Sequence, residues 1–144
     1  MSIYFDTSAM AKRYVAERGS AEIDRFVAAQ EADCVICPLV AIEFESILQR
    51  LQRQRLINAA FAHQARRDFA SDLTSAVWSM LGFDAACFAR GTELLRTLKS
   101  PLATLDALHL ACAIESGCHA IATGDRQLAR AAEESGLTIH SFIV

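Results

Sequence analysis

Short apolar segments alternate with longer helical patterns along the whole chain, and this alternation constrains the fold most. The apolar segments are residues 2–5, 34–37, 76–81, 119–123 and 137–143. Between them the chain is rich in alanine, and the whole sequence has only two prolines and six glycines, which favours helices. Strands without polar alternation are typical of parallel sheets covered on both faces. We therefore predict an α/β protein of three layers (α/β/α) with a short, mostly parallel central sheet of four to five strands.

Capping residues and breakers place the expected helices between these strands. The length of 144 residues fits one domain, and we find no linker or repeat that would divide residues 1–144. Thr7 or Ser8 is expected to cap the first helix, and Thr104 the helix that follows Pro101. The expected helices cover residues 8–17, 20–30, 38–55, 58–72, 84–98, 105–115 and 126–135.

The charge is unevenly distributed along the chain. There are 17 acidic and 14 basic residues, for a net charge of −3, which argues weakly against binding nucleic acid by bulk charge alone. Residues 46–67 hold five arginines and no acid, so the rest of the chain carries −8. The question is therefore which of those acids lie together.

Four acids fall where parallel strands end or the next helix begins. Asp6 immediately follows the first strand, and Asp125 follows the fourth. Asp106 lies in the first turn of its helix, and Glu43 lies about one and a half turns into another. In an open parallel sheet ligands bind at the carboxyl ends of the strands. Clustered carboxylates raise one another's pKa unless a cation neutralises them, and oxygen ligands suit Mg²⁺ or Mn²⁺.

Each acid taken alone also has an ordinary structural explanation. Asp106 suits a helix N-terminus through the helix dipole, Asp125 could be an N-cap, and Glu43 could be solvated. Glu45 competes with Glu43 for the same role. Two residues on a helix differ by about 200° of rotation, so only one of them can face the site, and spacing alone does not choose between them.

The cysteines and the apolar segments bear on the compartment. Cys34 and Cys37 form a C-x-x-C pattern, but on a strand these positions point to opposite faces, which favours buried structural cysteines over a metal or redox site. The odd total of five cysteines argues against a disulfide scaffold. We find no membrane-spanning run and no signal peptide, and therefore expect a cytoplasmic protein.

Four segments of this sequence are similar to the motifs of one family. They are IYFDTSAMAKRY, PLVAIEFESILQRL, TLDALHLACAIESG and AIATGDRQLARAAEESGLTI. In this order, and over nearly the whole chain, they resemble the PIN-domain family, specifically its VapC-type ribonuclease toxins. The resemblance selects Glu43 over Glu45. Related proteins often carry an arginine shortly before the third segment, whereas LKSPLA offers only Lys99, to which we assign no role.

The resemblance implies a function and a set of site residues. It implies catalytic metal ligands for one or two Mg²⁺ or Mn²⁺ ions at Asp6, Glu43, Asp106 and Asp125. It makes Thr7 and Thr123 candidates to hold these carboxylates by hydrogen bonds. It further implies hydrolysis of RNA phosphodiester bonds, a homodimer, and a cognate antitoxin protein that blocks the pocket.

For four basic residues and His109 the sequence leaves more than one role open. Lys12, Arg13, Arg50 and Arg53 are candidates to bind RNA phosphates, although the arginine-rich stretch could instead contact an acidic antitoxin or be solvated. For His109 we favour a structural or supporting role over general acid–base catalysis.

Two other functions compete with the ribonuclease. A non-catalytic PIN-like module could bind RNA or protein with the same fold. A phosphatase could use Asp6 as a nucleophile, but that chemistry usually needs a second aspartate two residues later, where this chain has Ser8.

Overall fold

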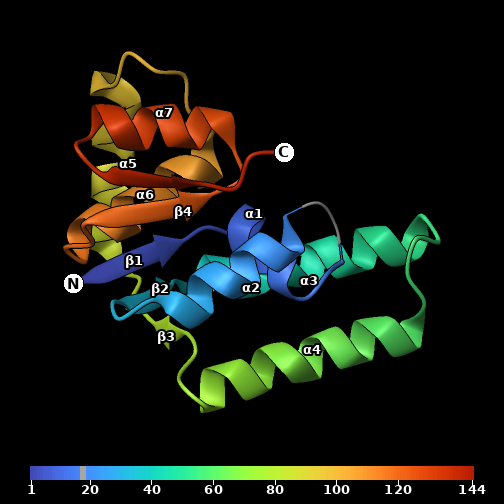
Figure 1. Cartoon of the computed structure of the whole chain (residues 1–144). Coiled ribbons are helices and arrows are strands. Elements are labelled where there is room, and N and C mark those ends of the chain that lie inside the picture. Colours follow the sequence, from blue (N-terminus) through green and yellow to red (C-terminus); the bar gives the residue numbers. More distant parts are fainter. Residues whose placement is uncertain (17–18) are drawn as a thin grey trace.

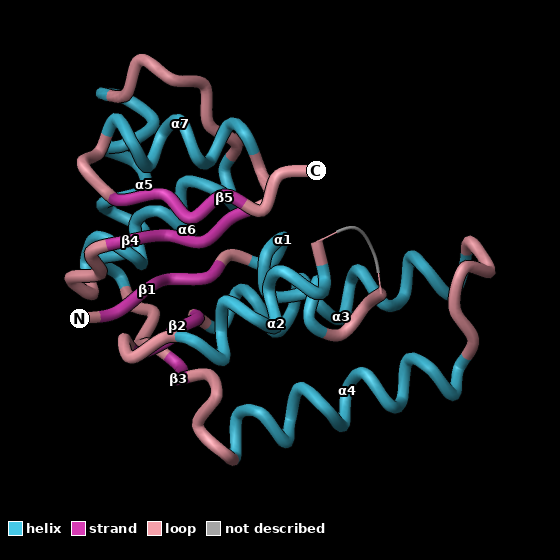
Figure 2. The backbone as a smooth tube through the Cα atoms, viewed as in Figure 1, coloured by secondary structure: helices cyan, strands magenta, loops and turns pink. Residues whose placement is uncertain are grey.

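A computed structural model describes residues 1–16 and 19–144, and its centre is one parallel sheet. The strand order is β3-β2-β1-β4-β5, which can be followed in Figure 2. The register places Ile3 of β1 opposite Cys34 on one side and Ala120 on the other. The strands are β1 (Ser2–Phe5), β2 (Asp33–Ile36), β3 (Ser79–Met80), β4 (Ala120–Thr123) and β5 (Thr138–Ser141).

Helices cover both faces of this sheet, so the predicted three-layer α/β/α architecture is confirmed (Figure 1). On one face lie α1 (Thr7–Met10), the 3₁₀ helix η1 (Ala11–Arg13), α2 (Ser20–Ala29), α3 (Pro38–Arg53) and α4 (Ala59–Thr74). On the other lie α5 (Ala85–Thr97), α6 (Thr104–Glu115) and α7 (Arg126–Glu134). None of the helices in the described ranges is both long and apolar enough to cross a membrane.

Successive side chains of each strand pack alternately into two hydrophobic cores, one on each face of the sheet. Ile3 and Phe5 of β1 pack into the core beneath α1–α4, whereas Tyr4 between them packs into the core beneath α5–α7. Cys34 belongs to the first core and Cys37 to the second, as expected for positions that point to opposite faces of a strand. Burial on both faces explains why these strands lack polar alternation.

Two of the expected helix caps are wrong, and the first helix is shorter than predicted. Asp6 caps α1 in place of Thr7 or Ser8, because its carboxylate accepts the Ala9 backbone N–H at 2.9 Å. Thr104 is already helical, and Ala103 is the N-cap residue without a side-chain bond. α1 passes into η1, which ends at Arg13, and the predicted end at residue 17 lies outside the described residues.

The third strand is also shorter than residues 76–81. The backbone N–H groups of Val77 and Trp78 donate to the carbonyl of Asp72 at the end of α4, so they are not available to the sheet. Ala76 has a φ of 60°, which turns the chain at this point. The ladder with β2 therefore begins at Ser79.

The strand order creates a reversal point at the centre of the sheet. The chain moves from β1 to β2 and β3 on one side, then returns to β4 and β5 on the other. In open α/β sheets such a switch point leaves a crevice at the carboxyl ends of the two central strands. Asp6 and Asp125 stand at these ends of β1 and β4.

Candidate functional site

The four predicted acids line one open pocket of about 360 Å³ at the reversal point. Four different segments bring them there: the end of β1, helix α3, the first turn of α6, and the end of β4. The pocket is lined by Asp6, Thr7, Ser8, Glu43, Ser46, Ile47, Arg50, Leu105, Asp106, His109 and Asp125. Residues distant in sequence thus form a single acidic surface.

Asp6 is the most deeply buried of these acids, with 3% of its surface exposed. Its Oδ2 accepts the Thr123 hydroxyl at 2.6 Å, its Oδ1 accepts the Ala9 N–H at 2.9 Å, and the Ser8 hydroxyl lies 2.7 and 2.8 Å from the two oxygens. Burial raises the pKa of Asp6, and the hydrogen bonds from Thr123, Ala9 and Ser8 offset part of that shift. The carboxylate is therefore fixed in one orientation.

Glu43 is held by Thr7 and His109, and both bind the same carboxylate oxygen. The Thr7 hydroxyl donates to Oε1 at 2.9 Å, and Nε2 of His109 makes a short hydrogen bond to Oε1. Burial alone would raise the pKa of Glu43, but these two partners lower it below its ordinary value. Glu45 does not line this pocket and instead forms an ion pair with Arg66 of α4 at 2.7 Å.

His109 connects Glu43 to two buried residues, Tyr4 and Cys37. Its Nδ1 lies 2.6 Å from the Tyr4 hydroxyl, which donates in turn to Sγ of Cys37 at 3.0 Å. Nε2 donates to Glu43, because an ionised carboxylate can only accept, and Nδ1 shares the second hydrogen bond with the Tyr4 hydroxyl. Burial lowers the pKa of His109, but its interactions with the nearby Cys37 sulfur and with Glu43 outweigh burial and raise the pKa to about 10. The negative charges of Glu43 and Asp6 thus favour the charged form of His109.

Asp106 and Asp125 complete the pocket in different ways. Asp125 caps α7 by accepting the Leu128 N–H at 3.0 Å, and its own N–H donates to the Thr123 hydroxyl at 3.0 Å. For Asp106, burial and then the negative charges of Asp125, Asp6 and Glu43 raise the pKa to about 6. Burial and the neighbouring acids therefore both disfavour the ionised form of Asp106.

The donor set fits a hard divalent cation. Within the described residues, no group of three or more His, Cys, Asp or Glu side chains is already arranged to hold a metal ion. The four carboxylates nevertheless supply only oxygen donors, which suit Mg²⁺ or Mn²⁺. After burial, the charges of Asp125, Asp6 and Glu43 add to the raised pKa of Asp106, and a cation would relieve that repulsion.

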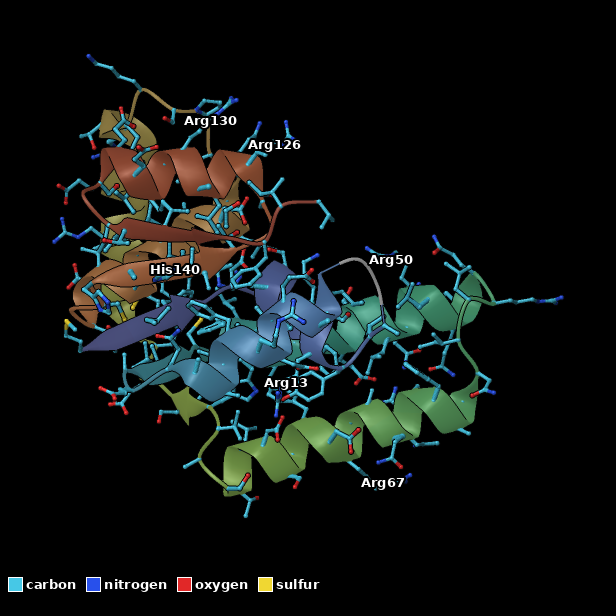
Figure 3. All side chains as sticks on the ribbon, in the orientation of Figure 1. Arg13, Arg50, Arg67, Arg126, Arg130 and His140 are labelled. Atoms are coloured by element: carbon cyan, nitrogen blue, oxygen red, sulfur yellow. The ribbon has the colours of Figure 1, made fainter. Side chains whose placement is uncertain are left out.

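The four predicted basic residues are not equivalent. Arg50 of α3 lines the acidic pocket, and Arg53 is exposed one turn further along the same helix. Arg13, labelled in Figure 3, instead pairs with Asp72 at 2.8 Å and Asp24 at 3.1 Å and does not line the pocket. Lys12 is buried, with its side chain packed beside Gly19 and Gly124.

Ser8 was expected only as a helix cap and a hydroxylated neighbour of Asp6, and Tyr4 was not predicted as a site residue. Ser8 contacts both oxygens of Asp6 and accepts the Gly124 N–H at 2.8 Å, so it ties the ends of β1 and β4 together. The sequence signal for this role is a hydroxyl group two residues after Asp6. Tyr4 carried no signal, because an apolar strand predicts a core aromatic and not a hydroxyl that binds His109.

The fold and the acidic pocket define a class of protein, and comparison with known families agrees. Residues 3–134 match the PIN domain family, and the chain therefore belongs to that family. This confirms the resemblance that the four sequence segments indicated. A search of curated proteins gives no match.

Solved structures with the same fold include proteins of toxin–antitoxin systems. The chain is 14% identical to FitAcB from Neisseria gonorrhoeae, with 97% of each chain covered and a TM-score of 0.73. It is 20% identical to VapC20 of Mycobacterium tuberculosis, a toxin that cleaves the sarcin-ricin loop, over 90% of this chain and 94% of that one, with a TM-score of 0.68. A DNA-bound VapBC2 from Rickettsia felis is 15% identical over 98% of each chain, with a TM-score of 0.69.

Proposed function

We propose that this chain is a metal-dependent endoribonuclease and the toxin of a toxin–antitoxin pair. The observation that carries the proposal is the set of four carboxylates around one pocket at the carboxyl ends of β1 and β4 in a PIN domain. Similarity of fold to VapC20, a toxin that cleaves an RNA loop, supports RNA as the substrate.

The proposed chemistry divides the residues of the pocket by role. Asp6, Glu43, Asp106 and Asp125 would hold Mg²⁺ or Mn²⁺. When bound, such an ion lowers the pKa of a water and offsets charge on the phosphodiester. Thr7 and Thr123 orient Glu43 and Asp6 by hydrogen bonds. Ligand-orienting contacts of this kind typically contribute about 10–100-fold to metal affinity or activity.

Removal of metal is the direct test of this function. We expect the purified chain to cut RNA internally with Mg²⁺ or Mn²⁺, to stop when excess EDTA is added, and to recover when Mn²⁺ exceeds the chelator. The products would be followed on denaturing gels. Cleavage that persists in EDTA would refute a metal-dependent site, and metal-independent RNA binding without cleavage would favour the non-catalytic module.

Arg50 is expected to bind RNA phosphates at the rim of the acidic pocket. The change Arg50→Ala removes one positive charge beside the four acids, so RNA affinity should fall about 3–10-fold, and the slope of affinity against salt should fall by about one unit. Arg67→Ala is the matched control, because Arg67 lies exposed on α4, where it donates a hydrogen bond to Gln64, and does not line the acidic pocket (Figure 3). Equal losses in both variants would show that Arg50 has no special role.

The proposed partners follow from the same family. We propose a cognate antitoxin, since solved neighbours include a toxin–antitoxin complex from Klebsiella pneumoniae and a VapBC2 assembly, and we propose a homodimer in the cytoplasm. Light scattering of the purified chain, alone and with the product of an adjacent gene, would measure both assemblies.

A further inference from the structure

A chain of hydrogen bonds links two points of helix α3 through two other elements. It runs from Cys37 at the N-cap of α3 to Tyr4 of β1, to His109 of α6, and back to Glu43 of α3. We propose that Tyr4 and His109 are positioning residues, which fix the Glu43 carboxylate so that one oxygen is held in the pocket wall and the other is presented to a divalent cation. Only the cation in this statement rests on the proposed function.

The contacts of Glu43 show this division between its two oxygens. Thr7 and His109 both bind Oε1. Among the described residues, no hydrogen bond engages Oε2, which leaves that oxygen available to the pocket that Glu43 lines. A glutamate has three rotatable side-chain bonds, so holding it in advance removes ordering entropy that a metal ion would otherwise have to offset.

Burial makes the two positioning residues rigid. Tyr4 is fully buried and His109 is 1% exposed, and their rings contact each other with centroids 5.8 Å apart. Both ring nitrogens of His109 are occupied, so a flip of the imidazole would break both bonds. The Tyr4 hydroxyl therefore sets the ring orientation, and the ring orientation sets Glu43. This series of hydrogen bonds also gives Cys37 a structural role, because its Sγ accepts from Tyr4 at the end of the series opposite to Glu43.

A simpler explanation is that these buried polar groups merely satisfy one another. That explanation predicts a loss of stability when one of them is removed, but no effect on metal binding. The two explanations therefore differ in the metal affinity of a variant that keeps its fold.

Comparison of Tyr4→Phe with Tyr14→Phe distinguishes the positioning role from the simpler structural explanation. Both changes remove one hydrogen-bonded hydroxyl from a buried ring, but Tyr14 binds Asp72 and Trp78 and does not line the pocket. In the full-length chain, calorimetry with Mn²⁺ should show affinity about 10–100-fold weaker for Tyr4→Phe and unchanged for Tyr14→Phe. His109→Phe, which removes the donor itself, should weaken Mn²⁺ binding at least as much as Tyr4→Phe.

A second measurement needs neither metal nor activity. Nitrogen-15 NMR of the metal-free wild type should show a slowly exchanging proton on Nε2 of His109, which Glu43 holds, and an Nδ1 signal that reflects the hydrogen bond to Tyr4. Tyr4→Phe should shift the Nδ1 and Nε2 signals, while Tyr14→Phe should change neither. If Tyr4→Phe leaves the ring signals and the Mn²⁺ affinity as in wild type, the positioning role is wrong. If it alters the ring signals but not the affinity, the simpler structural explanation holds and the proposal is again wrong.

Failure of the proposed function has a different signature. If wild type binds no Mn²⁺ while the ring signals still depend on Tyr4, the metal-dependent function is refuted. The Tyr4–His109–Glu43 chain would in that case stand on the NMR result alone.

Discussion

Asp6→Asn is expected to reduce RNA cleavage at least about 100-fold while the chain remains folded. The change removes the negative charge of the acid that lies deepest in the pocket. Asparagine is a good N-cap, so its oxygen can still accept the Ala9 N–H, and the hydroxyl of Thr123 can reverse to accept from the new amide. Circular dichroism and initial rates of cleavage, measured side by side, would check both parts.

Glu45→Gln is the control for this prediction. Glu45 lies two residues from Glu43 on the same helix, but it pairs with Arg66 and is outside the pocket. Its rate should stay within about twofold of the wild type, because an exposed ion pair adds little to stability and this pair lies outside the pocket. If Asp6→Asn cuts RNA as fast as Glu45→Gln, the four carboxylates are not the active site.

Asp106→Asn is expected to raise the stability of the metal-free chain although it lowers cleavage at least about 100-fold. Burial and the charges of Asp125, Asp6 and Glu43 raise the pKa of Asp106 from 3.8 to about 6, so the ionised group is unfavourable in the folded state near neutral pH. After a discount for solvent screening, its removal should stabilise the chain by an amount on the order of 1 kcal/mol, which raises Tm by about 2–4 °C.

The pH dependence of this stabilisation has a definite sign. Because the pKa of Asp106 is higher in the folded state than in the unfolded state, the folded chain holds the proton more tightly. The penalty in the wild type is absent near pH 4 and complete above about pH 6, so the two Tm values should converge in acid and separate at pH 7.5. Asp68→Asn, which removes a charge from the exposed side of α4, is the control and should show no such separation.

Saturating Mg²⁺ should reverse the order of thermal stability of the wild type and Asp106→Asn. If Asp106 binds the ion, saturating Mg²⁺ stabilises the wild type more than Asp106→Asn, because a ligand that binds only the folded state adds stability. Thermal unfolding with and without Mg²⁺ measures this. A variant that is less stable than wild type at pH 7.5 without metal would contradict the assigned charge repulsion.

The sequence predicted the layers well because each prediction rested on local patterns. The apolar segments without alternation became parallel strands, and the helix expected over residues 58–72 is α4, which Asn58 caps with its Oδ1 accepting the Phe61 N–H at 2.8 Å. The errors arose where a backbone N–H group had a second available acceptor. Asp6 and not Thr7 or Ser8 caps α1, and the N–H groups that would have lengthened β3 donate to a carbonyl at the end of α4.

What the sequence determined by itself was the order of elements, the two-sided burial of the strands, and the positions of four acids near strand ends or helix starts. These properties depend on periodicity and chain order alone. Only the tertiary structure decided which side chains meet. It placed Arg13 in ion pairs and Arg50 at the acidic pocket, and it turned Glu43 inward and Glu45 outward. It also joined Tyr4 to His109, 105 residues apart, because the reversal of strand order brings β1, α3 and α6 to one crevice.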